Sequence, residues 1–575
     1  MFGCDLLLLH APSVYDFRKE TLLFGPVSDV VPSTPVFEMY PVGFGFISEH
    51  LARLGYSTRI LNLAYRMLSD CNFDPEAALA RRKPRLAFGI DLHWLPHAHG
   101  AIEVARGCKR LHPNIPVVLG GLASTYFHEE IIQDEAVDFV LRGDSTERPW
   151  GMLLDALAGR GDLASVPNLT YKDGSGQVRI NPLSNVEADL DLQENVYLHL
   201  FRSGVKHLDI KDMIPFHDWW KYPITAVMTC RGCTQNCAIC GGSRSGYAFY
   251  CGREKIAMRS PEKLAMDVIH LARYSRGPIF LIGDLRQGGM DAARRFLDLL
   301  GPRRIKNHMV LELFSGADRD FIGRVASTFP NFNFEMSPET HDDRLRSMAG
   351  KPYTNKQVEE SVRLALDHGA KKFDLYYMTG LPGQDPASVL ETIEYCRSLM
   401  ERFDQRLNLF ISPLAPFLDP GSVAYEKADE MGYEILFRKF EDYRKALLQP
   451  SWKYTLNYRT RWMDRDQIVS STYEAGRRLN RLKWEKGYVD PETAQQIDGR
   501  IAMAEELIAK IDAIVRDTEE GPDRRRRLLE LKASVEAASA STVCGTEEIK
   551  WPLLLGGNFR FFNVGWDILF GPRPR

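Results

Sequence analysis

Residues 224–240 read ITAVMTCRGCTQNCAIC, and this stretch decides how the fold is interpreted. An apolar, strand-like run at 224–228 is followed by a loop with three cysteines, Cys233, Cys237 and Cys240, in the spacing CxxxCxxC. Three thiolates on one tight loop can bind three irons of a cubic 4Fe-4S cluster, which leaves the fourth iron open to a small molecule. An open iron indicates chemistry rather than electron storage alone.

The spacing of these cysteines also permits two other interpretations. A structural zinc site normally has four Cys or His ligands, and Cys230 could complete a set of four cysteines. Free cysteines also gather in apolar cores as small hydrophobic residues. The chain has ten cysteines and four of them lie within 230–240, which indicates metal ligation in a reducing compartment rather than a disulfide framework.

The residues after this loop continue a regular alternation of strands and helices. Strand-like runs lie at 224–228, 279–282, 309–314, 332–336, 372–378 and 407–411, and helical patterns at 260–274, 290–301, 355–369 and 386–402. Six βα-like units of this kind predict a partial or complete TIM-like βα barrel, whose active site lies at the carboxyl ends of its strands. The cysteine loop follows the first strand and is therefore expected on that face.

The first 150 residues show the same alternation. Their strand-like runs lie at 6–9, 58–61, 86–90, 117–119 and 139–141, which predicts a doubly wound, Rossmann-like parallel sheet with helices on both faces. Such sheets bind ligands beyond the carboxyl ends of their strands. Two loops are expected there, GGLAST at 120–125 and RGDSTE at 142–147. Paired glycines let a backbone approach a bulky ligand closely, although Gly-Gly is also an ordinary turn.

The rest of the chain has a different pattern. Residues 151–220 contain a hairpin turn at 171–176 and are interpreted as a connector. Beyond residue 425 the chain is mainly helical, with charged helices expected at 465–486 and 491–516, and it closes with an aromatic, apolar segment at 551–570.

Composition is ordinary for a globular protein. The 575 residues suffice for about three domains, and 44% are apolar and 26% charged. A net charge of -3 gives no reason to expect a nucleic-acid partner. The N-terminus lacks the basic start and cleavage site of a signal peptide, and no apolar run approaches the roughly 20 residues that span a bilayer. We therefore expect a cytoplasmic protein without a transmembrane segment.

The three-cysteine loop after the first strand of a βα series resembles the radical S-adenosylmethionine superfamily, and the preceding α/β region is similar to cobalamin-binding domains. The chain thus resembles the cobalamin-binding radical S-adenosylmethionine proteins over about residues 1–425. This resemblance divides the chain into a cobalamin-binding domain (1–150), a connector (151–220), a radical S-adenosylmethionine barrel (221–425) and a helical accessory region with an aromatic tail (426–575). In this context Cys230 is expected to be a bystander.

The resemblance also implies roles for particular residues. Cys233, Cys237 and Cys240 would bind the cluster and form its catalytic loop. For S-adenosylmethionine, it implies contacts from residues after the second, fourth and fifth barrel strands, namely Asp284, Glu339, Arg344 and Gly380. For cobalamin, it implies contacts from the two loops of the first sheet, namely Gly120, Gly121, Ser124 and Gly143. Each of these residues is also explained as an ordinary part of a βα turn.

The chain departs from familiar patterns at two points. Cobalamin-dependent mutases and methionine synthases carry Asp-x-His-x-x-Gly after the first strand, whereas His10 opens a loop without that motif. Asp91-Leu92-His93 mimics the opening of the motif, but it follows the third strand and lacks the glycine. The resemblance therefore implies cobalamin without a protein histidine ligand, and His10, His93, His97 and His99 are expected to be ordinary polar or core residues. Arg66 is a candidate neighbour of the lower face of cobalt. Ile239 replaces the usual aromatic residue before the last cysteine, which predicts weaker packing on adenine.

In the family, S-adenosylmethionine chelates the open iron and is reductively cleaved to a 5'-deoxyadenosyl radical. The first hypothesis is a class B-type methyltransferase that methylates an unactivated carbon with cobalamin as the methyl carrier. A second is radical cyclisation, rearrangement or oxidation without methyl transfer, and a third is a non-catalytic iron-sulfur or cobalamin-binding module. The expected partners are a small-molecule substrate, hydrophobic or lipid-like in view of the apolar tail, and an electron donor such as flavodoxin or ferredoxin.

Overall fold

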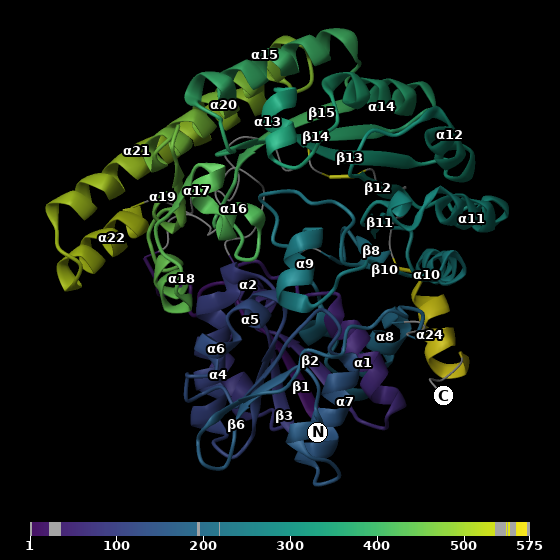
Figure 1. Ribbon diagram of the computed structural model, residues 1–575, viewed down its shortest axis with the longest axis vertical. Helices are drawn as coiled ribbons and strands as arrows, with labels where there is room; N and C mark the ends of the chain where they lie inside the picture. The colour runs from purple at the N-terminus through teal and green to yellow at the C-terminus, as the bar shows by residue number, and fades with distance from the viewer. Residues whose placement is uncertain are drawn as a thin grey trace.

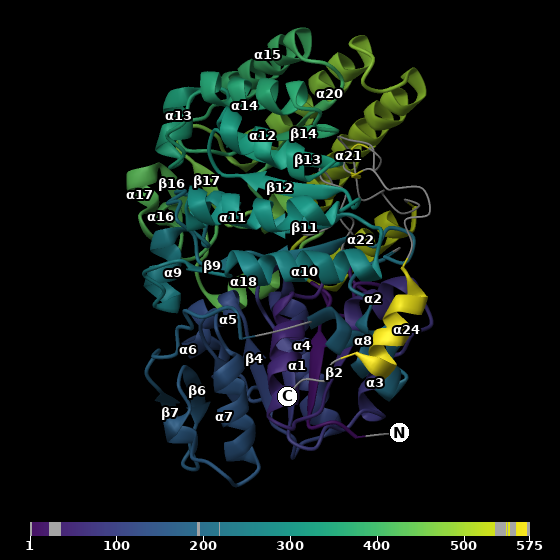
Figure 2. The same cartoon turned by 90° about the vertical axis from the view of Figure 1, so that its right-hand side faces the viewer.

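The computed structural model describes residues 3–21, 36–192, 196–217, 219–534, 548, 550–551 and 559–571. Within these ranges the chain forms two large sheets that lie one above the other along the long axis of the molecule (Figure 1). The N-terminal sheet is the lower one, and the C-terminal helices run along one side of the upper one (Figures 1 and 2). The sequence-based prediction of an α/β fold with a mainly helical C-terminal region is confirmed.

The first sheet is parallel over most of its width. Its strands are β1 (Leu6–His10), β2 (Thr58–Asn62), β3 (Ala87–Asp91), β4 (Val117–Gly120), β5 (Phe139–Leu141), β6 (Leu169–Lys172) and β7 (Val178–Ile180). They lie in the order β2-β1-β3-β4-β5-β6-β7. Residues of α1 (Gly43–Arg53) and α7 (Glu147–Leu157) pack against one face, and residues of α4 (Ala98–Leu111) against the other. Burial on both faces explains why β1 and β3 are mostly apolar.

The predicted hairpin at 171–176 is present, but it belongs to the first sheet. β6 and β7 form the hairpin, and β6 pairs antiparallel with β5. The Asp173 carboxylate accepts hydrogen bonds from the backbone N–H groups of Ser175 and Gln177, which tightens the turn. The sheet thus runs on to Ile180 instead of ending near residue 150, because the hairpin pairs with the edge of β5 that would otherwise be open.

The second sheet is entirely parallel and has six strands, as predicted from the βα alternation. They are β8 (Thr225–Met228), β11 (Ile279–Ile282), β12 (Met309–Leu313), β13 (Phe332–Glu339), β14 (Lys372–Thr379) and β15 (Leu407–Pro413). Consecutive strands are neighbours, so the order is β15-β14-β13-β12-β11-β8. The connecting helices include α10 (Pro261–Tyr274), α11 (Met290–Leu300), α14 (Asn355–Asp367) and α15 (Pro386–Arg402), each within two residues of its predicted bounds.

This sheet is a partial barrel, because β8 and β15 are its two edges. Tyr197, on α8 (Val196–His207), covers the edge of β8. Its hydroxyl donates to the backbone oxygen of Ala226 at 2.8 Å and accepts from the backbone N–H of the same residue at 2.9 Å. One side chain thus satisfies both backbone groups of an edge residue, which blocks pairing with another chain there.

The C-terminal helices pack around the barrel. The predicted helices at 465–486 and 491–516 are α20 (Arg465–Glu485) and α21 (Pro491–Asp517), followed by α22 (Pro522–Ser534). The last helix, α24 (Phe561–Phe570), lies beside α8 (Figure 2), and its Asp567 forms an ion pair with Arg273 of α10 at 2.7 Å. Residues 552–558 of the predicted aromatic tail lie outside the described residues. No helix among the described residues is long and apolar enough to cross a membrane.

Candidate functional site

The cysteine loop lies after β8 and is fixed by backbone hydrogen bonds from distant parts of the barrel. The N–H of Ala238 donates to the oxygen of Ala349 at 2.8 Å, and the oxygen of Ala238 accepts from the N–H of Ala424 at 2.8 Å. The N–H of Gly241 donates to Asp419 Oδ2 at 3.2 Å. Segments after the fourth and sixth strands therefore hold the loop at the carboxyl face of the barrel.

Gly350 brings one of these segments unusually close to the loop. Its φ is +84°, and a Cβ at this position would lie 2.4 Å from the oxygen of Asn236 and 2.9 Å from Cys237 Cα. Only glycine permits this approach without displacing the loop. The sequence contained no motif at Gly350, so reasoning from the sequence missed it.

The three predicted cluster ligands are close enough to influence one another. Burial is the main cause that raises the pKa of Cys233 to about 11, and the nearby Cys237 and Cys230 both contribute to the rise. Within the described residues, no three Cys, His, Asp or Glu side chains converge on one point as a single ion requires. A cubic cluster would bind each thiolate to a different iron, which does not require the three side chains to converge on one point.

Cys230 is also near Cys233, but it lies in a different element. It belongs to β9 (Cys230–Arg231), which pairs with β10 (Ala257–Met258). Gln287 lies between it and Cys233, since Gln287 Nε2 is 3.6 Å from the Cys230 sulfur and its Oε1 is 3.3 Å from the Cys233 sulfur.

Glu339 and Lys351 form a buried ion pair next to the cysteine loop. Glu339 ends β13 with a φ of +68°, and the Lys351 ammonium also donates to the oxygen of Ser337 at 2.7 Å. Glu339 Oε2 is buried and accepts no hydrogen bond from any described residue. A buried carboxylate oxygen without a donor is an acceptor available to a ligand, such as the amine of S-adenosylmethionine.

The other residues expected at S-adenosylmethionine have partners within the protein. Asp284 is buried, forms an ion pair with Arg286 and accepts from the N–H of Phe314 at 2.9 Å, which ties the ends of β11 and β12 together. Gly380 has a φ of +100°, and a Cβ there would lie 2.5 Å from the hydroxyl of Tyr458.

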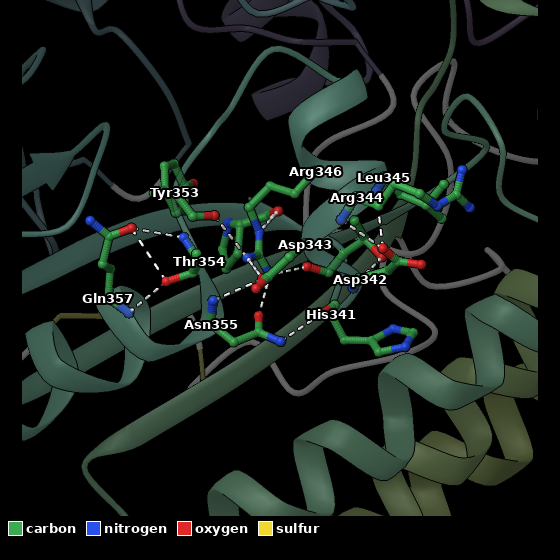
Figure 3. A network of polar contacts seen from close by, with 12 residues as sticks. His341, Asp342, Asp343, Arg344, Leu345, Arg346, Tyr353, Thr354, Asn355 and Gln357 are labelled. Atoms are coloured by element: carbon green, nitrogen blue, oxygen red, sulfur yellow. Dashed lines mark hydrogen bonds and ion pairs between the residues drawn. The ribbon is translucent and has the colours of Figure 1, made fainter.

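Arg344 is exposed on α13 (Asp343–Met348), where its guanidinium lies 3.7 Å from Met348 Sδ. Arg346, two residues further on, is fully buried and donates to the backbone oxygens of Pro338 and Tyr353 at 3.0 and 3.1 Å. Figure 3 shows the two arginines pointing in different directions. The buried Arg346 thus stabilises the end of β13. The exposed Arg344 is the residue for which the resemblance implied a contact with S-adenosylmethionine.

Three of the residues expected at cobalamin hold one turn after β3. The N–H of Leu92 donates to the oxygen of Gly120 at 2.7 Å, and the oxygen of Leu92 accepts from the N–H of Ser124 at 3.1 Å. Gly121 has a φ of +121°, and a Cβ there would lie 2.5 Å from the N and Cα atoms of His93. Gly143, the fourth, donates its N–H to Thr125 Oγ1 at 2.8 Å.

Histidines gather around Asp91 at the carboxyl ends of β1 and β3. His10 Nδ1 lies 2.9 Å from Asp91 Oδ1 and His93 Nδ1 lies 2.8 Å from Asp91 Oδ2. Burial alone would raise the pKa of Asp91, but the two histidines hold it well below its usual range. His10, His97 and His99 are buried, as expected for core histidines, whereas the His93 side chain is 32% exposed.

A cavity of about 80 Å³ separates this edge of the first sheet from the cysteine loop. Its lining includes His93, Trp94 and Tyr126 from the first sheet's side and Gly241, Gly242 and Asp419 from the barrel's side. Buried ion pairs fix the spacing of the two sides, since Arg231 binds Glu147 at 2.9 Å and Arg253 binds Asp144 at 3.0 Å. The carboxyl edges of both sheets thus face one cavity.

Comparisons with known proteins agree with this two-part arrangement. The family "B12 binding domain" matches residues 29–149 and "Radical SAM superfamily" matches residues 227–396. An uncharacterised methyltransferase of Pyrococcus horikoshii is 30% identical over 372 residues, which are 62% of this chain and 73% of that protein. The anaerobic magnesium-protoporphyrin IX monomethyl ester cyclase of Synechocystis is 25% identical over 266 residues, 46% of this chain. The chain spans about half (49%) of the length of that cyclase.

Two solved structures share the fold. The radical S-adenosylmethionine methyltransferase TsrM from Kitasatospora setae, with cobalamin and a 4Fe-4S cluster bound, superimposes with a TM-score of 0.57 at 15% identity, covering 85% of this chain and 90% of TsrM. The cobalamin-dependent S-adenosylmethionine radical enzyme OxsB, with aqua-cobalamin and S-adenosylmethionine bound, has a TM-score of 0.50 at 13% identity, covering 92% of this chain and 70% of OxsB.

The fold and the cysteine loop define a radical S-adenosylmethionine protein. In particular, this chain belongs to the members of that superfamily that carry an N-terminal B12-binding domain. The cofactors of this family are a 4Fe-4S cluster, S-adenosylmethionine and cobalamin. The residues present fit them, because the thiols are spread over one fixed loop, Glu339 has an unused acceptor, and His93 faces the cavity between the sheets.

Proposed function

We propose that the protein is a cobalamin-dependent radical S-adenosylmethionine methyltransferase that methylates an unactivated carbon of a small hydrophobic molecule. The observation that carries the proposal is the single cavity onto which both the cysteine loop and the carboxyl edge of the first sheet open. When bound, the cofactors supply a 5'-deoxyadenosyl radical and a transferable methyl group. The protein then has to bind and orient the cofactors and the substrate, and to exclude water from them.

We assign these tasks to particular residues. Cys233, Cys237 and Cys240 hold the cluster, while Gly350 keeps their loop in place through its close approach to Cys237. Glu339, held by Lys351, accepts a hydrogen bond from the amine of S-adenosylmethionine. Asp284 and Gly380 shape the ends of the second and fifth strands around it. Gly120, Gly121, Ser124 and Gly143 support the cobalamin edge of the first sheet.

A second, larger cavity supports a hydrophobic substrate. It measures about 360 Å³ and runs along the edge of β8, between α1, α8 and the barrel. Phe46, Phe201, Trp219, Phe280 and Trp551 contribute aromatic rings to its wall.

Residues of the first two barrel strands form part of the wall of the larger cavity. Ala226, Met228 and Ile282 line it, and these residues alternate with the strand residues that face the outer helices. Met228 lies five residues before Cys233, so a molecule in this cavity would lie next to the strand that leads into the cysteine loop.

The second candidate is radical ring formation or oxidation without methyl transfer. The 25% identical relative that is named a cyclase favours it. A non-catalytic module is the third candidate. All three share the expectation of a small-molecule ligand, and the two enzymes also need an electron donor such as flavodoxin or ferredoxin.

The products of S-adenosylmethionine distinguish these candidates. The protein is reconstituted without oxygen with iron, sulfide and cobalamin, then incubated with S-adenosylmethionine, a reductant and a hydrophobic cell extract. Methyl transfer predicts S-adenosylhomocysteine together with 5'-deoxyadenosine. Deoxyadenosine alone supports the second candidate, and neither product supports the third. Cys237→Ala is the inactive control and Cys230→Ala the matched active one.

A further inference from the structure

His93 occupies the point of the first sheet where a ligand is expected. The strand order β2-β1-β3-β4 reverses direction between β1 and β3, and open α/β sheets bind ligands in the crevice at such a point. Asp91 ends β3, and His93 follows two residues later. Because β3 lies directly beside β1, a histidine after β3 reaches the same edge as one after β1.

The hydrogen bonds of His93 fix which of its nitrogens is available. A carboxylate accepts only, so His93 Nδ1 donates its proton to Asp91 Oδ2 at 2.8 Å. The other nitrogen, Nε2, then carries a lone pair in the neutral ring, and it forms no hydrogen bond within the described residues. A carboxylate that orients a histidine through one nitrogen, leaving the other for a metal, is the usual arrangement at metal sites.

The neighbouring His10 binds the other oxygen of the same carboxylate. Its Nδ1 donates to Asp91 Oδ1 at 2.9 Å and its Nε2 donates to the backbone oxygen of Phe37 at 2.9 Å, so both nitrogens carry protons. Although burial disfavours the charged ring, Asp91 raises the pKa of His10. His10 is thus the buried cation that balances Asp91.

The backbone around His93 is rigid. Gly120 and Ser124 bind the backbone of Leu92, and Gly121 packs against the backbone of His93 so closely that a Cβ would lie 2.5 Å from it. Rigid support of this kind is what a metal ligand needs, because a misplaced ligand loses affinity. It also gives these three residues a role that involves no direct contact with the cofactor.

The opposite wall of the cavity is the cysteine loop. His93 and Trp94 line one side of it, and Gly241 and Gly242, directly after Cys240, line the other. A flat cofactor between these walls would present one face to His93 and the other to the loop. Cobalamin exceeds the enclosed 80 Å³, so its entry requires part of the lining to move; Trp94 in that lining is 39% exposed.

We propose that His93 binds the cobalt of cobalamin through Nε2, on the face turned away from the cysteine loop, with Asp91 orienting its ring. This site rests on cobalamin binding and not on the methylation proposed above. It reverses the sequence-based expectation of cobalamin without a histidine ligand.

The test uses the full-length protein with all histidines labelled with nitrogen-15, loaded with unlabelled cobalamin and reduced to the cob(II) state. In the paramagnetic resonance spectrum, one axial nitrogen-15 splits each cobalt line into a doublet, and one nitrogen-14 splits it into a triplet. We expect doublets. Triplets would assign the ligand to the dimethylbenzimidazole of the cofactor, and unsplit lines would mean no nitrogen ligand; either result overturns the proposal.

Variants identify which histidine is bound. In labelled protein, His93→Ala is expected to abolish the doublets, whereas His112→Ala is expected to retain them, because His112 Nε2 donates to the backbone oxygen of Leu79, far from this edge. Doublets that persist in His93→Ala contradict the assignment to His93. The labelled wild-type spectrum decides the presence of a histidine ligand even if a variant fails to fold, and product formation plays no part in the result.

Discussion

The indole N–H of Trp551 donates a hydrogen bond of 2.7 Å to Glu335 Oε1, which joins the C-terminal segment to the interior of the barrel. The same ring packs on Phe280 of β11 with 5.5 Å between ring centroids, and the Trp551 backbone exchanges hydrogen bonds with the hydroxyl of Tyr222. Next to it, Glu548 forms an ion pair with Lys483 at 2.5 Å. The C-terminal segment is therefore part of the wall of the larger cavity.

Trp551→Phe should keep the ring contact and lose the hydrogen bond to Glu335. An unsatisfied buried polar group costs about 1–3 kcal/mol, so we expect a lower thermal midpoint. Trp484→Phe is the matched control, because that indole is 47% exposed. Equal midpoints for the Trp551 variant and the wild type would show that the segment does not close the cavity wall.

Glu335 should make the stability of the protein depend on pH. Burial, followed by the nearby Asp374, raises its pKa to about 8. The folded state then holds a proton that the unfolded state has released, so this contribution is complete below the ordinary Glu pKa and is lost as pH rises through 8. The slope is at most about 1.4 kcal/mol per pH unit.

We therefore expect the thermal midpoint to fall between pH 5 and 8 by less in Glu335→Gln than in the wild type, since glutamine cannot ionise. The contribution of Glu335 is the difference between the two curves, because Asp374, whose pKa is also raised by burial, titrates in both. Parallel curves would contradict the buried, protonated state of Glu335.

Replacement of single cysteines should separate the cluster from a zinc site. Cys233→Ala, Cys237→Ala and Cys240→Ala should each lose most of the iron bound after reconstitution. Cys230→Ala should retain it, because Cys230 lies in the β9–β10 ladder beyond Gln287. The iron and zinc content of each variant, measured on the same samples, distinguishes a cluster from a zinc site. Loss of bound metal in Cys230→Ala would restore the four-cysteine zinc interpretation.

Gly350→Ala should damage the cysteine loop specifically. A Cβ at this position would lie 2.4 Å from Asn236 O, whereas a Cβ at Gly369, with a similar φ of +88°, would meet nothing within 4 Å. Both variants bear the cost of about 1–2 kcal/mol for a left-handed backbone. We expect Gly350→Ala to bind much less iron and Gly369→Ala to bind as much as the wild type. Similar iron content in both would mean that the contact with the loop is unimportant.

Glu339→Gln should weaken the binding of S-adenosylmethionine. Hydrogen bonds to charged groups contribute about 1.5–3 kcal/mol, which corresponds to a dissociation constant about 10–100 times higher. Equilibrium dialysis with the cluster-loaded protein measures it. Arg344→Ala tests the assignment made by resemblance, and its exposed position predicts a smaller loss than that of Glu339→Gln. The reverse order would place the ligand near α13 instead.

Much of the architecture could be predicted because it depends on local patterns. Strands such as 279–282 and helices such as 386–402 follow from hydrophobic periodicity, and the cysteine spacing is local by nature. The β6–β7 hairpin was recognisable from its turn residues. Its pairing with β5 was not, because a turn does not reveal which strand of a sheet the hairpin pairs with.

The site depended more on contacts between distant segments. Gly350 and Lys351 carry no motif, and only the folded chain brings them to Cys237 and Glu339. Arg344 and Arg346 are two residues apart on one helix, and only the packing shows which is buried. The position of His93 depends on β3 lying beside β1, which is a property of strand order and not of the sequence around the histidine.

The central claim is that the cluster and cobalamin face each other across one cavity. Its most direct test is the spin relaxation of cob(II)alamin in the protein with the cluster oxidised and diamagnetic, and then reduced and paramagnetic. We predict markedly faster relaxation when the cluster is reduced, and no such change in Cys237→Ala, which lacks the cluster. Relaxation that is unaffected by reduction of the cluster in the wild type would contradict the account, because the two centres would then not share a site.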